Sequence, residues 1–179
     1  MVYVFLADGF ETVEALAPVD IMRRAGIEVN TVSITASHTV KSKQNVTVEA
    51  DALIDGIEPE RAEMFVLPGG LPGADNLFAC EKLRKILMHA DRADKYLAAI
   101  CAAPYILGQL GLLEDKIAVC YPGFEDKLTC AIVGDSKVVT DKNVITAVGM
   151  GVSVQFGLEI VSVLRGKEQA DKIAAGIQL

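Results

Sequence analysis

The chain has 179 residues, and with 51% of them hydrophobic it can bury one sizeable core. Its 17 basic and 24 acidic residues give a net charge of −7, which excludes the positive surface that nucleic acid or an anionic membrane attracts. We therefore expect neither a nucleic-acid partner nor a membrane partner. Because no Pro-, Gly- or Ser-rich linker interrupts the chain, we predict a single domain over residues 1–179.

The cysteine spacing and the first residues bear on compartment and metal content. The four cysteines have neither CxxC pairing nor the spacing of a His-assisted zinc site, so we expect free thiols, no disulfide scaffold and no metal. The opening apolar run, residues 2–7, is too short for a signal-peptide core or a membrane span. These features favour a cytoplasmic protein.

The first third of the chain alternates strand and helix patterns. The β-prone run at residues 2–7 predicts a strand buried on both faces, and residues 10–25 predict a helix. Its predicted apolar stripe consists of Val13, Leu16, Ala17 and Ile21. The segment Arg23-Arg24-Ala25-Gly26 predicts the end of that helix, so residues 27–34 are expected to form a second, parallel strand.

The next segments continue this alternation. Residues 39–51 alternate apolar and polar side chains, which predicts a small two-stranded flap with one solvated face. The apolar run 64–67 leads into Pro68-Gly69-Gly70, which is typical of a buried strand that ends in a glycine turn. Helical spacing returns over residues 83–90, before the apolar run 97–100.

The most informative stretch is residues 97–104, where an apolar run meets a cysteine and then a helix start. Pro104 suits the first helical turn, because its missing N–H would have no partner there. The pattern predicts a strand, a tight turn at Cys101 and a helix up to Gly111. A thiol in that turn lies near unpaired helix N–H groups, which favour the thiolate.

The remaining third is predicted to contain short strands and two helices. The short strands are expected at residues 117–120, 129–133, 137–140 and 144–148, with hairpin turns at 134–136 and 141–143. The helices are expected at residues 152–164, with Val152, Phe156, Ile160 and Val163 buried, and at 167–175. The whole pattern predicts an α/β fold, a three-layer α/β/α sandwich with a mostly parallel, flavodoxin-like sheet and a small hairpin flap.

Sites in such folds form beyond the carboxyl ends of the strands, so Cys101, the glycine turn and the first helix are expected on one rim. A free cysteine is most often a small buried hydrophobe, but the strand-to-helix turn favours a reactive Cys101. Glu14 is expected to be buried among apolar neighbours, which would raise its pKa, keep it protonated and let it donate a hydrogen bond that stabilises the thiolate. Glu11 shares a helix face with Glu14 and is a candidate substrate contact, although the helix dipole explains it more simply.

The other candidate side chains are weaker. His38 precedes the flap and His89 lies near a helix end, so both are interpreted as surface or structural residues rather than as the base of a cysteine nucleophile. Cys80, Cys120 and Cys130 lack the strand-to-helix turn and are interpreted as structural.

Along nearly its whole length the chain resembles the ThiJ/PfpI superfamily, and within it the branch of the parkinsonism-associated deglycase. The matching segments are 6–14, Pro18-Val19-Asp20, 23–26, 67–70, 98–104 and 149–151. The resemblance implies the class I glutamine amidotransferase-like fold, a nucleophilic Cys101 and a protonated Glu14. It also implies site-facing N–H groups on Gly70 and Ala102, and a homodimer that packs the first helix, with Val13, against its mate.

Two positions depart from relatives of this superfamily. Tyr121 stands where the human-type protein has a site histidine, and its phenol could still donate a hydrogen bond to substrate. Ala102 replaces the histidine of the protease-like branch, and no His-x-Glu partner of the amidotransferases follows. Peptidase and amidotransferase activities are therefore disfavoured.

These observations predict a cysteine-dependent, cofactor-independent glyoxalase or deglycase that acts on small α-oxoaldehydes or on glycated protein. An alternative is a redox-sensing stress protein or chaperone that uses an oxidisable Cys101. A third interpretation is a stress protein that keeps the fold while its site is degenerate. The sequence does not separate the three.

Overall fold

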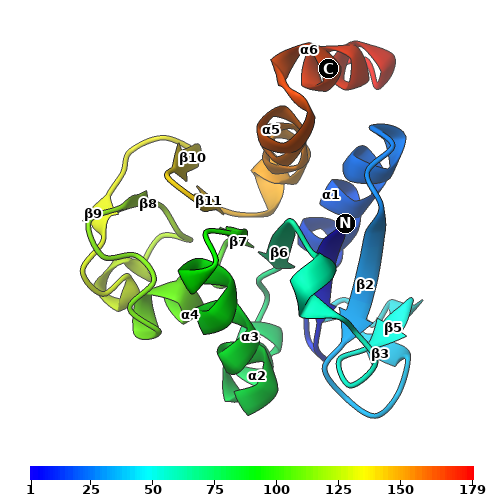
Figure 1. Cartoon of the computed structure of the whole chain (residues 1–179), viewed down its shortest axis with the longest axis vertical. Helices are drawn as coiled ribbons and strands as arrows, with labels where there is room; N and C mark the ends of the chain where they lie inside the picture. The colour runs from blue at the N-terminus through cyan, green and yellow to red at the C-terminus, as the bar shows by residue number, and fades with distance from the viewer.

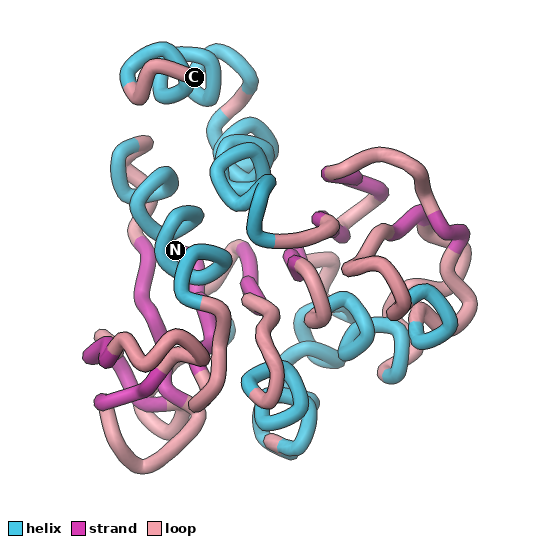
Figure 2. Tube along the Cα trace, turned by 180° about the vertical axis from the view of Figure 1, so that it is seen from behind, coloured by secondary structure: helices cyan, strands magenta, loops and turns pink.

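The computed structural model describes all 179 residues and has three layers (Figure 1). Helices α1, α5 and α6 lie on one side of a central sheet, and α2, α3 and α4 lie on the other. Figure 2 shows the same two groups of helices from behind, with the strands between them. The predicted three-layer α/β/α sandwich is confirmed.

The central sheet has seven strands in the order β10-β11-β7-β6-β1-β2-β5, and only β10 runs antiparallel to its neighbour. Its strands are β1 (Val2–Leu6), β2 (Val29–Ser33), β5 (Ala52–Leu53), β6 (Met64–Leu67), β7 (Tyr96–Ile100), β10 (Val138–Asp141) and β11 (Val144–Ala147). The connections diverge on either side of β1, which is the doubly wound topology that places a ligand site at that point.

The helices cover both faces of the sheet because each central strand is apolar on both sides. They are α1 (Thr12–Arg24), α2 (Gly73–Ala79), α3 (Glu81–Arg92), α4 (Pro104–Gln109), α5 (Ser153–Arg165) and α6 (Lys167–Gly176), with short 3-10 turns at Pro59–Arg61, Glu125–Lys127 and Met150–Val152. Tyr3 and Phe5 pack toward α2, α3 and α4, whereas Val2, Val4 and Leu6 pack toward α1 and α5. None of these helices combines the length and the apolar composition that crossing a bilayer requires.

Helix α1 buries a different side from the one its apolar pattern indicated. Its core-facing side includes Glu14, Ala15, Pro18, Val19 and Met22, whereas Val13 is 42% exposed and Leu16 and Ala17 are half-buried. The reason is packing against α5, where a Cβ on Gly157 would lie 3.0 Å from the Cα of Pro18. Three members of the predicted stripe therefore form an outer apolar edge, and only Ile21 is in the core.

In the last third of the chain one prediction is correct and another is wrong. The hairpin turn at 141–143 joins β10 and β11, as expected. The hairpin expected at 134–136 does not form, because β9 (Ile132–Val133) pairs in parallel with β8 (Ile117–Ala118) in a separate small sheet. The predicted flap is present as β3 (Thr39–Lys41) paired antiparallel with β4 (Thr47–Glu49).

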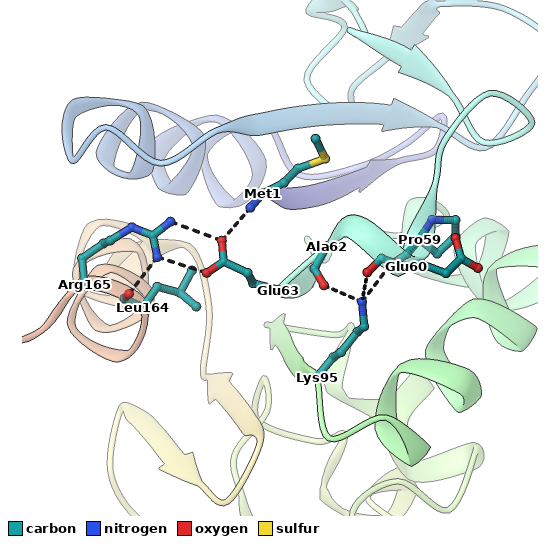
Figure 3. Close-up of polar contacts among 8 residues, drawn as sticks. All are labelled: Met1, Pro59, Glu60, Ala62, Glu63, Lys95, Leu164 and Arg165. Carbon is teal, nitrogen blue, oxygen red and sulfur yellow. Dashed lines mark hydrogen bonds and ion pairs between the residues drawn. The ribbon is translucent and has the colours of Figure 1, made fainter.

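Polar contacts fasten the amino ends of the central strands (Figure 3). The Glu63 carboxylate accepts hydrogen bonds from the Met1 ammonium at 2.6 Å and from Arg165 of α5 at 3.1 and 3.2 Å. The Lys95 ammonium donates to the carbonyls of Pro59, Glu60 and Ala62. These contacts tie β1, β6, β7 and α5 together at the end of the sheet opposite the site described next.

Candidate active site

Four neighbouring parallel strands end on one rim of the sheet, and each is followed by a residue of the candidate site. Strand β1 leads through a short loop to Glu14 on α1, β6 to Gly70, β7 to Cys101, and β11 to Met150. The strands are adjacent in the order β11-β7-β6-β1, so segments far apart in the sequence are brought to a single edge.

Cys101 occupies the tight turn between β7 and α4 with a φ of 65°, a left-handed conformation that is strained for a residue with a side chain. The turn is held from both sides. The Cys101 N–H donates to the Ala147 carbonyl at 2.8 Å, and the Tyr121 N–H donates to the Cys101 carbonyl at 2.8 Å. The sulfur therefore has a fixed position at the end of the strand, while its side chain remains partly accessible.

Glu14 is only 1% exposed, and its carboxyl is hydrogen-bonded to the Cys101 thiol. The Gly69 N–H donates to Glu14 Oε2 at 3.0 Å, and the N–H of Met150 also donates to this carboxyl. On the other side of the pair, the N–H groups of Gly70 and Ala102 donate to the Cys101 sulfur. Sulfur and carboxyl thus form one hydrogen-bonded unit in contact with four backbone donors.

The two glycines after β6 explain how this unit fits together. A Cβ on Gly69 would lie 2.7 Å from Glu14 Oε2 and 2.8 Å from the Cβ of Cys101, so any side chain there would separate the pair. Gly70 has a φ of +87°, and a Cβ there would lie 2.5 Å from the Glu11 nitrogen. Glycine at both positions lets the β6 turn approach α1 and the Cys101 turn closely.

The ionisation of this pair follows from its burial. Burial raises the pKa of Glu14 to about 7, and repulsion from Glu11 acts in the same direction. Burial, followed by the negative charge of an ionised Glu14, raises the pKa of the Cys101 thiol to about 12, although the N–H groups of Ala102 and Gly70 lower it. The sulfur and the carboxyl therefore do not ionise together, and Cys101 is an anion only while Glu14 holds the proton.

This result corrects one expectation and supports another. The helix N-terminus was expected to lower the pKa of the Cys101 thiol, but burial and the adjacent acid outweigh it, and α4 spans only Pro104–Gln109. The expected rise in the pKa of Glu14 is present and comes mainly from burial. The state of the sulfur thus depends on where the pair keeps its proton.

The pair opens into a cavity of about 400 Å³. It is lined by Glu14, Gly70, Cys101 and Ala102. The predicted contacts Glu11 and Tyr121 also line it, and Tyr121 is 51% exposed. The sequence did not single out four further lining residues, Lys43, Leu71, Phe124 and Met150. Met150 lies in a segment that carried the superfamily resemblance, whereas no motif marks Lys43, which the flap brings to the cavity only in the folded chain.

The remaining cysteines and histidines lie outside this cavity. Cys120 is buried, Cys80 is half-buried and Cys130 is exposed. His38 is fixed by a hydrogen bond between Nδ1 and the Ala50 carbonyl at 2.7 Å. No group of three or more His, Cys, Asp or Glu side chains is arranged to hold a metal ion.

Fold and site together define an α/β protein with a cysteine at a strand-to-helix turn and an acid from the first helix beside it. The sequence profile of the DJ-1/PfpI family matches residues 1–163. Protein DJ-1 homolog A of Arabidopsis thaliana is 36% identical over 173 residues, which cover 95% of this chain but 44% of that longer protein. The chain belongs to the DJ-1/PfpI family, and the superfamily resemblance is confirmed.

Two further relatives bear on structure and chemistry. The structure titled Toxoplasma gondii DJ-1, oxidized, superposes with a TM-score of 0.95 at 36% identity and covers 99% of this chain and 97% of its own. A Caenorhabditis elegans relative named glutathione-independent glyoxalase DJR-1.2 is 26% identical, over 91% of this chain and 87% of its own length.

Proposed function

We propose that this chain is a cysteine-dependent, cofactor-independent glyoxalase or deglycase that acts on small α-oxoaldehydes such as methylglyoxal, or on their protein adducts. The observation that supports this proposal is the hydrogen-bonded pair of Cys101 and Glu14 at a cavity, with backbone N–H groups directed at the sulfur. The worm relative named glutathione-independent glyoxalase DJR-1.2 supports the same chemistry.

In the first step the Cys101 thiolate attacks the aldehyde carbon of methylglyoxal. A C–S bond forms, the carbonyl π electrons move to oxygen, and the N–H groups of Gly70 and Ala102 stabilise the developing oxyanion. In this reactive form the proton of the pair lies on Glu14, which transfers it to that oxygen and becomes a carboxylate. The product of this step is a neutral hemithioacetal.

In the second step Glu14, now a carboxylate, takes the proton from the former aldehyde carbon and returns it to the neighbouring carbon through an enediol. The first carbon is thereby oxidised to a thioester and the second is reduced to an alcohol. Water then cleaves the C–S bond, which releases lactate and restores the thiol. The reaction needs no external oxidant, because the electrons lost by one carbon are gained by the other.

Lactate production from methylglyoxal by the purified chain tests this proposal. We expect turnover in the wild type and its loss in Cys101→Ser, while Cys130→Ser, which removes the exposed thiol, keeps it. Full turnover by the Cys101→Ser variant would eliminate the mechanism.

A redox-sensing role is a second candidate, supported by the accessible Cys101 side chain and by the relative whose structure is described as oxidised. A thiolate attacks hydrogen peroxide, which breaks the O–O bond and gives a sulfenic acid and hydroxide; the hydroxide takes up a proton to become water, and a second peroxide converts the sulfenic acid to a sulfinic acid and water. Intact-mass and peptide mapping after mild peroxide are expected to place the added oxygen on Cys101. Oxidation of the exposed Cys130 ahead of Cys101 would remove the basis for this role.

We also propose that the chain is one domain, localises to the cytoplasm and forms a homodimer. The outer apolar edge of α1, formed by Val13, Leu16 and Ala17, supports the dimer, since a second copy of that edge would cover it. Sedimentation of the wild type and of Val13→Asp tests it. A wild type that sediments as a monomer would contradict it.

A further inference from the structure

Lys43 is the one basic side chain that lines the cavity of Cys101 and Glu14. It lies in the turn between the flap strands β3 and β4, and its ammonium group takes part in none of the ion pairs of the chain. The methylglyoxal chemistry proposed above has no use for a cation. The Lys43 side chain is exposed, so its ammonium group is free to meet an anion that enters the cavity.

The backbone on either side of Lys43 is firmly attached to the start of α1. The Lys43 N–H donates to the Phe10 carbonyl at 2.8 Å, and the Gly9 N–H donates to the Lys41 carbonyl at 2.8 Å. The Thr12 hydroxyl donates to Ser42 Oγ at 2.7 Å. The flap is thus a fixed wall of the cavity, and it presents the Lys43 side chain from a defined place.

The one carboxylate on the same wall is already engaged. Glu11 lines the cavity, and its Oε2 accepts a hydrogen bond from Gln44 Nε2. This neutral amide satisfies one oxygen of the Glu11 carboxylate without cancelling its charge, whereas Lys43 takes part in no ion pair. Glu11 still opposes an incoming anion, so the two side chains are expected to act with opposite signs.

The cavity has room for a substrate that reaches from Cys101 to Lys43. Its volume of about 400 Å³ lies within the range of about 300–1,000 Å³ that is typical of pockets for drug-sized ligands. This volume is larger than methylglyoxal needs. Cys101 comes from the end of β7 and Lys43 from the flap beside α1, so the two side chains approach the cavity from different elements.

We propose that Lys43 is a specificity-determining residue that binds an anionic group of the substrate. The preferred substrate is then an α-oxoaldehyde whose far end carries a carboxylate or a phosphate, with its aldehyde carbon at Cys101. This inference deepens the proposed function and rests on it, but the charge effect on Cys101 can be measured without any turnover.

The first test compares two alkylating reagents that differ in charge, iodoacetate and iodoacetamide, in a Cys130→Ser background with Cys101 followed by peptide mass. The ratio of their rates cancels any change in the pKa of the thiol, because the same thiolate attacks the carbon of both reagents and displaces iodide. We expect Lys43→Gln to lower the iodoacetate-to-iodoacetamide ratio roughly three- to tenfold and Lys43→Arg to preserve it. Glu11→Gln is expected to raise the ratio.

Lys167→Gln is the matched control, since it removes one positive charge from α6, outside the cavity, and is expected to leave the ratio unchanged. An unchanged ratio in Lys43→Gln, or an equal fall in Lys167→Gln, would overturn the inference, because the field at Cys101 would then not depend on Lys43.

The second test measures kcat/KM for 4,5-dioxopentanoate, an α-oxoaldehyde with a terminal carboxylate, and for its neutral methyl ester. We expect the wild type to prefer the carboxylate and Lys43→Gln to lose most of that preference. If both proteins turn over methylglyoxal and show the same preference for the carboxylate over the ester, the role of Lys43 is contradicted and the glyoxalase proposal is unaffected. A shifted alkylation ratio without any turnover would contradict the glyoxalase proposal and leave anion binding by Lys43 standing.

Discussion

Two glutamates at opposite ends of the same sheet have pKa values that are shifted in opposite directions. Glu14, at the carboxyl ends of the strands, is enclosed beside Cys101, and burial raises its pKa to about 7. Glu63, at the amino ends, has a 42% exposed side chain, and hydrogen bonds from Arg165 and the chain's amino terminus lower its pKa to about 2. One end of the fold keeps an acid able to hold a proton near neutral pH, and the other keeps a permanent anion.

The difference shows where this fold tolerates an energetic cost. A buried carboxyl without a cation destabilises the folded chain once it ionises, and a non-glycine residue at positive φ adds strain. Both features meet at the Cys101 turn. The amino-end contacts are ion pairs and helix or loop carbonyls with satisfied partners, which is the arrangement expected of a region whose role is to hold strands together.

The largest expected effect that separates the two glutamates is on turnover. Glu14→Gln keeps the size of the side chain but removes the proton carrier, so we expect kcat/KM for methylglyoxal to fall about 10²- to 10⁴-fold. Glu63→Gln is the matched change at the other end of the sheet, and it should keep wild-type turnover. Lactate assays on both variants check this. Equal activity in the two variants would show that the glutamate at the carboxyl ends of the strands is no more important for turnover than the one at the amino ends.

The next effect is on the pH dependence of stability. The pKa of Glu14 is raised from 4.5 to about 7 on folding, so its contribution is fully present below about pH 4.5 and is lost as pH rises through 7. The wild type should therefore lose up to about 3 kcal/mol relative to Glu14→Gln between pH 4.5 and 8. Denaturant unfolding of both proteins at several pH values measures it. A constant difference across this range would show that Glu14 does not titrate in the folded chain.

A similar or smaller effect is expected from Gly69→Ala, which tests the packing that brings the pair together. The new Cβ would lie 2.7 Å from Glu14 Oε2 and 2.8 Å from the Cys101 Cβ, so we expect a loss of about 1–3 kcal/mol in the free energy of unfolding. Gly176→Ala, where a Cβ meets open space, is the control and should not destabilise the chain. Urea unfolding of both variants gives the comparison, and equal stability would contradict the close approach.

The smallest effect is expected at Glu63. Its pKa is lowered on folding, so its contribution is present above the unfolded value of 4.5 and is lost as pH falls through about 2. Because its side chain is 42% exposed, Glu63→Gln should cost only about 0.5–1 kcal/mol at pH 7 and nothing near pH 2. Thermal unfolding at the two pH values checks this. A larger cost at low pH than at neutral pH would have the wrong sign.

Much of the fold could be predicted because its signals are local. The apolar runs at β1, β6 and β7, the Pro104 helix start and the alternating flap each depend on neighbouring residues. The prediction was wrong where pairing depended on distant partners. The turn at 134–136 resembles a hairpin, yet β9 pairs with β8 instead, and the apolar stripe on α1 gave no sign that α5 would cover the opposite side.

The sequence by itself determined the alternation of strands and helices, the Cys101 turn and the presence of a glutamate early in the first helix. Each of these features depends on residues that are close together in the chain. The sequence also predicted a buried Glu14 with a raised pKa beside the sulfur. Only the tertiary structure decided that burial raises the pKa of the Cys101 thiol as well, and that the flap brings Lys43 to the cavity. Both depend on contacts between segments separated in the chain, and no local pattern encodes those contacts.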